Sequence, residues 1–176
     1  MEPMQRVLVA GTSGTGKTTV ARAIGTALDL PVTELDGLFH GPGWTPLPTF
    51  LDDVRALVAS ERWVTEWQYP AARPLLAARA EVLVWLDLPF RVTLRRLVQR
   101  TVRRRLRREE LWNGNVEAPL WTVLTDDDHI VRWAWQTRNM LEEIVPQAQR
   151  ENRHLAVVRL RSQRDVDAWL AGLRRA

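Results

Sequence analysis

Apolar residues recur along this chain in two patterns, one typical of strands and one typical of helices, and together the two patterns predict an α/β fold. Five short apolar runs of strand length alternate with stretches whose apolar positions recur at helical spacing. The predicted strands cover residues 6–10, 31–36, 62–67, 81–87 and 154–160, and the predicted helices cover residues 18–28, 51–59, 74–79, 90–106, 126–149 and 164–173. Because strand–helix–strand connections are right-handed, this order predicts a parallel sheet with helices on both faces and ligands at the carboxyl ends of the strands.

The turn between the first strand and the first helix carries the clearest motif. Residues 11–18 read Gly-Thr-Ser-Gly-Thr-Gly-Lys-Thr, a full match to the phosphate-binding loop G-x-x-x-x-G-K-[ST]. Backbone N–H groups at a helix N-terminus favour an anion, and the Thr18 hydroxyl is placed to bind Mg²⁺. The motif therefore predicts a three-layer P-loop NTPase fold with ATP and Mg²⁺ as cofactors. The predicted nucleotide-binding residues of the loop are Gly11, Thr12, Ser13, Gly14, Thr15, Gly16, Lys17, Thr18 and Thr19.

Basic composition singles out one side chain of this loop. Of the 25 basic residues, Lys17 is the only lysine, and all others are arginine. The planar guanidinium does not fit where a compact ammonium must reach phosphate oxygens from within a tight loop. Lys17 is therefore the first predicted catalytic residue. A GTPase would need a second lysine for its guanine-reading [NT]-K-x-D string, so the sequence excludes that class.

Length and composition set wider limits. The 176 residues predict one domain spanning 1–176, large enough for its own core. The chain has no cysteine, which excludes disulfides and thiolate metal sites, and it shows no apolar run of membrane-spanning length. We expect a cytoplasmic protein without a membrane partner, and the oligomeric state stays open.

Several strings resemble a known group of enzymes. The P-loop, Asp36 after the second strand and the string Arg-Leu-Val-Gln-Arg at 96–100 resemble the nucleoside-monophosphate kinases. Strings at 35–37, 41–44, 107–115 and 133–135 are similar to adenylate-kinase-related proteins often labelled DNA topology modulation proteins. The resemblance implies an ATP-dependent phosphotransferase with a core, an acceptor-binding segment at about 37–60 and a lid insertion at about 101–127. It also implies that Arg96 and Arg100 meet the nucleotide.

The acceptor side departs from adenylate kinases, which carry an arginine just after the second strand and Asp-Gly-[FY]-Pro-Arg after the third. Here residues 37–39 read Gly-Leu-Phe and residues 66–70 read Glu-Trp-Gln-Tyr-Pro, so AMP is not supported as the acceptor. Shikimate- and deoxynucleoside-type kinases hold an acceptor hydroxyl with an acid directly after the second strand. Asp36 is therefore a candidate catalytic base. The alternative is that Asp36 only starts a turn or caps a helix.

A second acid is expected near the metal. Glu66 and Asp87 both end apolar strands, and either could hold a water on Mg²⁺. We favour Glu66, because the third strand lies beside the first in this architecture, whereas Asp87 is placed to cap the turn before Pro89. A purely structural role remains open for each.

Arginines crowd the fourth helix and its extension. Residues 91–108 hold nine arginines and no acid, and Arg96, Arg100, Arg104 and Arg108 recur every fourth residue. Like charges at this spacing repel by some tenths of a kcal/mol per pair, so we expect an anion to neutralise these arginines. That anion is the triphosphate of ATP, a nucleic-acid backbone, or the acids at 109–110 and 126–128. If the anion is the triphosphate of ATP, Arg100 and Arg104 are catalytic residues of the lid.

These observations predict a kinase that transfers the γ-phosphoryl of MgATP to a nucleotide or another small acceptor. The alternative is an ATP-binding regulatory module that acts on nucleic acid with little or no kinase activity.

Overall fold

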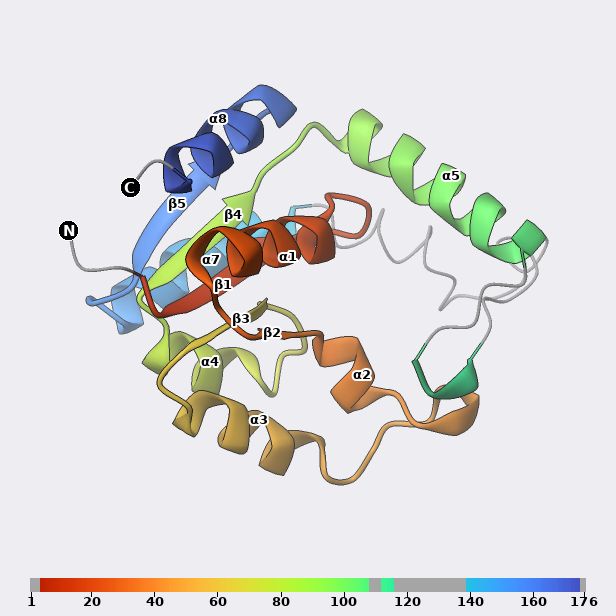
Figure 1. Ribbon diagram of the computed structural model, residues 1–176, viewed down its shortest axis with the longest axis horizontal. Helices are drawn as coiled ribbons and strands as arrows, with labels where there is room; N and C mark the ends of the chain where they lie inside the picture. The colour runs from red at the N-terminus through yellow and green to blue at the C-terminus, as the bar shows by residue number, and fades with distance from the viewer. Residues whose placement is uncertain (1–3, 108–111, 116–138, 175–176) are drawn as a thin grey trace.

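The computed structural model describes residues 4–107, 112–115 and 139–174, and five parallel strands form its centre in the order β2-β3-β1-β4-β5 (Figure 1). The strands are β1 (Arg6–Gly11), β2 (Val32–Thr33), β3 (Trp63–Glu66), β4 (Val82–Leu86) and β5 (Ala156–Leu160). The helices are α1 (Lys17–Leu28), α2 (Leu35–Phe39), η1 (Pro42–Trp44), α3 (Phe50–Ala59), α4 (Arg73–Arg79), α5 (Phe90–Arg107), η2 (Trp112–Gly114), α7 (Met140–Glu151) and α8 (Gln163–Leu173). This arrangement confirms the predicted parallel sheet and its helices on both faces.

The sheet is buried most deeply at its centre. All five residues of β4 and all four of β3 are buried, as expected for parallel strands covered on both faces. Successive side chains of β1 serve opposite cores: Leu8 and Ala10 pack with α3, α4 and α7, whereas Val7 and Val9 pack with α1 and α8. The two cores hold the carboxyl ends of β1, β3 and β4 at one edge of the sheet, where the P-loop begins.

Two predicted elements differ from the structure. The second strand was predicted to run to Asp36, but β2 ends at Thr33 and residues 35–39 form α2. The fully buried Leu35 anchors this short helix against the core, so Asp36 stands in the first turn of a helix rather than at the end of a strand. Of the helix predicted over 126–149, residues 126–138 lie outside the described residues. In the described part, α7 runs from Met140 to Glu151 after a turn at Asn139, so the predicted helix is not continuous through Asn139.

The predicted lid falls largely outside the described residues. Of residues 101–127, the structure describes the end of α5 up to Arg107 and the short segment 112–115. Within the three described ranges, no helix combines the length and the apolar character that a bilayer crossing would require.

Candidate active site

The P-loop leaves the first turn of α1 open to an anion. Gly14 and Gly16 adopt φ values of 85° and 92°, a region that favours glycine, and Gly16 caps α1 without a side-chain hydrogen bond. A Cβ atom at Gly14 would lie 2.3 Å from the carbonyl oxygen of Thr93, so the loop packs tightly on α5. Inside the loop, the buried Thr15 hydroxyl donates to the Thr12 carbonyl at 2.8 Å. The loop therefore has the shape of a preformed phosphate cradle.

The ammonium of Lys17 lies among several charged groups. Burial lowers its pKa, Glu66 and Asp36 oppose that shift, and Arg100 and Arg73 reinforce it. The two carboxylates and the two guanidiniums thus lie within electrostatic range of one lysine, although they come from α2, α4, α5 and the end of β3. The structure brings the predicted residues Lys17, Asp36, Glu66 and Arg100 together, and it adds Arg73.

Glu66 contacts the P-loop directly. Its carboxylate, only 3% exposed, accepts a 2.5 Å hydrogen bond from the Thr18 hydroxyl. Pairing of β3 with β1 places Glu66 opposite Val9 in this position. Burial raises the pKa of Glu66, and Lys17 and the Thr18 hydrogen bond oppose that shift.

Asp87, the other candidate for holding a metal-bound water, forms an ion pair with Arg159 instead. It accepts hydrogen bonds from the Arg159 guanidinium at 2.7 and 2.9 Å, which tie the end of β4 to β5. The geometry thus brings Glu66, and not Asp87, to Thr18.

The oxygen atoms around Thr18 could ligate a Mg²⁺ ion that is bound to a nucleotide. The Thr18 hydroxyl donates its hydrogen bond to Glu66, which leaves the lone pairs of Oγ1 for a cation, and Mg²⁺ prefers oxygen ligands. In the described part of the chain, no group of three His, Cys, Asp or Glu side chains forms a metal site of its own. The remaining ligands would have to be phosphate oxygens and water.

Asp36 is held at one oxygen. Its Oδ1 accepts hydrogen bonds from Gln68 Nε2 at 2.6 Å and from the Tyr69 hydroxyl at 2.5 Å, and His40 Nε2 lies 3.2 Å from the same hydroxyl. Burial and the nearby Asp36 raise the pKa of Tyr69, so this hydroxyl stays protonated and can donate. Tyr69 takes a φ of 61°, which turns the chain after β3 toward α2. The other oxygen of Asp36, Oδ2, has no hydrogen bond among the described residues.

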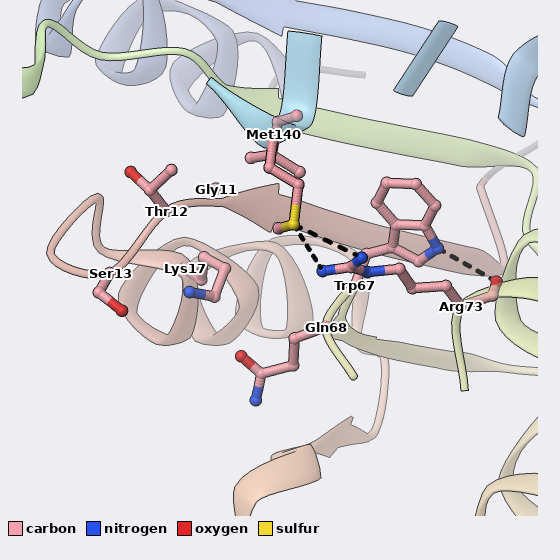
Figure 2. Close-up of a pocket in the computed structure, with 9 residues that line it drawn as sticks. Gly11, Thr12, Ser13, Lys17, Trp67, Gln68, Arg73 and Met140 are labelled. Atoms are coloured by element: carbon pink, nitrogen blue, oxygen red, sulfur yellow. Dashed lines mark hydrogen bonds between the residues drawn. The ribbon is translucent and has the colours of Figure 1, made fainter. Parts of the chain in front are cut away.

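A pocket opens between the P-loop and the opposite wall of the site (Figure 2). The opposite wall comes from the segment between β3 and α4 and from the start of α7. The lining residues are Gly11, Thr12, Ser13, Lys17, Trp67, Gln68, Arg73, Met140 and Leu141. The sequence did not indicate Gln68, Tyr69 or Arg73, because no motif marks them and their partners lie far away along the chain.

The arginines of α5 divide between two neighbours. Arg96 donates to the Gln163 side chain at the start of α8, at 2.9 Å, whereas Arg100 lies within electrostatic range of Lys17. Arg104 follows Arg100 by one helical turn. The structure therefore brings Arg100 within electrostatic range of Lys17 but turns Arg96 toward α8. The nucleotide-binding roles of Arg96 and Arg100 and the catalytic roles of Arg100 and Arg104 remain predictions.

Part of the predicted acceptor segment is joined to residues 112–115. The buried Asn115 side chain accepts from the backbone N–H of Trp44 at 3.0 Å and donates to the Gly41 carbonyl at 2.9 Å. Asn113 donates to the His40 carbonyl at 2.5 Å. Two segments more than 70 residues apart in the sequence are thus held side by side.

Comparisons with known proteins give a family match at the P-loop and several solved structures with a similar fold. The profile of the "ATPase family associated with various cellular activities (AAA)" matches residues 7–41, which include the P-loop, and no curated protein matches the chain. A shikimate kinase from Acinetobacter baumannii in complex with shikimate is 17% identical, with 99% of this chain and 93% of that chain covered and a TM-score of 0.56.

Two further structures are similar along their whole length. A gluconokinase from Sinorhizobium meliloti 1021 is 20% identical, with 99% and 96% of the two chains covered and a TM-score of 0.52. A shikimate kinase from Bacteroides thetaiotaomicron is 18% identical, with 98% and 97% covered and a TM-score of 0.53. The chain therefore has the fold of small P-loop kinases. The narrower relation to adenylate kinases and to DNA topology modulation proteins stays a prediction.

Proposed function

We propose that this protein is a kinase that transfers the γ-phosphoryl group of MgATP to a hydroxyl group of a small molecule. The observation that carries the proposal is the Asp36 carboxylate, whose Oδ1 is fixed by Tyr69 and Gln68 and which lies within electrostatic range of Lys17 of the P-loop. A domain that only bound ATP would not need a second carboxylate held in this way. The fold of small P-loop kinases supports the same conclusion.

The P-loop would hold the nucleotide. ATP supplies the phosphoryl group, and Mg²⁺ neutralises charge on its phosphates. The N–H groups at the start of α1 bind phosphate oxygens, and Lys17 reaches the β- and γ-phosphates. Thr18 binds the metal, and Glu66 orients the Thr18 hydroxyl and can hold a metal-bound water.

Asp36 would act on the acceptor. Its Oδ2 accepts no hydrogen bond from the described residues, so the acceptor hydroxyl can donate to it while Tyr69 and Gln68 keep the carboxylate in place. As the acceptor oxygen bonds to the γ-phosphorus, the bond from phosphorus to the bridging oxygen of ADP breaks, and the hydroxyl proton passes to Asp36. Arg100, and Arg104 one turn beyond, would stabilise charge that develops on the transferred group.

Transfer from ATP labelled in its γ-phosphoryl group tests the proposal. The labelled ATP is offered with Mg²⁺ and a panel of nucleotides, nucleosides, polyols and hydroxy acids, and labelled products are separated from inorganic phosphate. We expect at least one phosphorylated acceptor, and Lys17→Ala serves as the inactive control. Release of label only as inorganic phosphate, whatever the acceptor, would refute the proposed kinase activity.

A further inference from the structure

Arg73 is a cation in the pocket that has no carboxylate partner among the residues that the structure describes. Its two terminal nitrogens, Nη1 and Nη2, lie 3.9 and 4.0 Å from the sulfur of Met140, and a thioether is a weak acceptor. Within the described ranges, no Asp or Glu oxygen lies within ion-pair distance of this guanidinium, and its Nε is buried without a hydrogen-bond partner. A half-buried guanidinium of this kind normally finds an oxyanion, because its five N–H donors are costly to desolvate.

Arg159 provides a comparison, because it also lies over a tryptophan ring but has a carboxylate partner. The Arg159 guanidinium lies 4.1 Å from the ring centre of Trp85 and donates to Asp87 at 2.7 Å. The Arg73 guanidinium likewise lies over a tryptophan, 5.5 Å from the ring centre of Trp67. In the described part of the chain, a guanidinium therefore lies over a tryptophan ring at two places, once with an internal carboxylate and once without.

The fold holds Arg73 in position rather than leaving it to move freely. The indole N–H of Trp67 donates to the Arg73 carbonyl at 3.2 Å, so backbone and ring are fixed together. Figure 2 shows the side chain running along the wall of the pocket, with its nitrogen atoms directed toward the side where Lys17 and Ser13 lie. A preorganised guanidinium loses little entropy when an anion binds.

Arg73 also lies on the acceptor side of this pocket. Gln68 lines the same wall and donates to Asp36 at 2.6 Å, so one lining residue links the wall that holds Arg73 to the proposed base. The phosphate cradle, by contrast, belongs to the opposite wall. Burial lowers the pKa of Arg73. The pKa of Lys17 is also lowered, first by burial and in smaller part by Arg100 and Arg73, so Arg73 and Lys17 lie within electrostatic range of each other.

We propose that Arg73 binds an oxyanion of the acceptor, a carboxylate or a phosphate group, so that the substrate is a small hydroxylated anion rather than a neutral sugar or nucleoside. The inference rests on the proposed kinase function for the second substrate, but the anion site itself can be tested without turnover. The planar fork of Arg73 can give two parallel hydrogen bonds to either group, in place of its weak contacts with Met140.

Calorimetric titration in the presence of MgADP tests this site with matched compounds. One pair is a sugar acid and the corresponding alditol, and the other is a pentose 5-phosphate and the free pentose. We expect the anionic member of at least one pair to bind at least about tenfold more tightly than its neutral partner. The pair that shows the difference identifies the anion as a carboxylate or a phosphate.

Three variants connect that preference to Arg73. Arg73→Gln should abolish the preference by weakening the anionic member about 10- to 100-fold, with MgADP affinity unchanged. Arg73→Lys retains the charge but not the fork and should retain part of the preference. Arg159→Gln removes the other arginine stacked on a tryptophan and should leave the preference intact.

The outcomes separate this inference from the kinase proposal. Arg73-dependent binding of an anion without any phosphoryl transfer would support the anion site and count against the kinase. Equal binding of neutral and anionic members, no binding of any anionic member, or a preference that survives in Arg73→Gln would overturn the anion site, whether or not transfer occurs. Loss of MgADP affinity in Arg73→Gln would overturn it too, because the guanidinium would then belong to the nucleotide.

Discussion

The nucleotide side of the pocket comes from one stretch of eight residues, 11–18, whereas the acceptor side is assembled from α2, the turn after β3 and the start of α4. On the nucleotide side the contacts within the loop are local, as in the bond from Thr15 to Thr12, and the bond from Thr18 to Glu66 is the long-range exception. On the acceptor side the contacts join residues more than 30 positions apart, as in the bonds from Gln68 and Tyr69 to Asp36.

Because the two sides are built differently, they are suited to recognise different parts of the substrates. A local loop that presents backbone donors recognises a feature shared by all nucleotides, the phosphate chain. Side chains brought together from several elements can recognise one acceptor, because each can vary without disturbing the loop. Variants on the two sides should therefore change different activities.

The largest effect is expected from Lys17→Ala on the nucleotide side. Loss of the ammonium removes a positive charge from the phosphate cradle, and both transfer and slow ATP hydrolysis should fall by about 10³-fold or more while the fold stays intact. Lys17→Arg should be almost as inactive, because a guanidinium does not fit the loop. Steady-state rates and a thermal melt check both points. Wild-type turnover in Lys17→Ala would contradict the assignment of the P-loop.

Asp36→Asn should affect the acceptor side alone. The amide keeps the shape of the side chain but cannot take the hydroxyl proton, so transfer should fall by about 10²- to 10³-fold while ATP hydrolysis persists. Parallel assays of phosphorylated acceptor and free phosphate measure the two activities. Equal loss of both activities would give Asp36 a structural or metal-related role instead.

Tyr69→Phe should reproduce a weaker form of the same defect. The variant keeps the ring that stacks on Phe39 at 4.2 Å but removes the hydroxyl that donates to Asp36. We expect about a tenfold loss in kcat for transfer, with the KM for ATP unchanged. In a background that already carries Asp36→Asn, the added Tyr69→Phe should cost little more. A full additional tenfold loss in that background would show that Tyr69 acts independently of Asp36.

Glu66→Gln should change stability in a pH-dependent way. Because burial raises the pKa of Glu66, the folded protein keeps this proton to a higher pH than the unfolded chain, and stability falls as the pH rises above the ordinary value of 4.5. Glutamine carries no charge to bury, so its Tm should exceed that of the wild type by about 2–4 °C near pH 8 and match it near pH 4. A Tm difference that stays constant between these pH values would contradict the account.

Most of the fold could be predicted from the sequence because it depends on periodic burial. The fully buried run of β4 and the alternating faces of β1 follow from residue pattern alone, and the P-loop is a continuous motif. The short helix α2 was missed, because Leu35 is fixed by tertiary burial and not by local propensity. Residues 116–138, where the predicted helix was to begin, lie outside the described part.

The candidate site was predictable only in part, for the same physical reason. Lys17, Thr18 and Glu66 could be found because a motif and a strand end mark them. Tyr69 and Arg73 could not, since their contacts with Asp36, Trp67 and Met140 exist only once β3, α2, α4 and α7 are packed together. Contacts of this kind leave no local pattern in a single sequence.

The most direct test of the central claim is how the labelled γ-phosphoryl group divides between acceptor and water in the wild type and in Asp36→Asn. We expect the wild type to place most of the label on an acceptor hydroxyl, and Asp36→Asn to release it almost entirely as inorganic phosphate at an unchanged rate of hydrolysis. An unchanged ratio of transfer to hydrolysis in Asp36→Asn, or no labelled acceptor with the wild type, would contradict that claim.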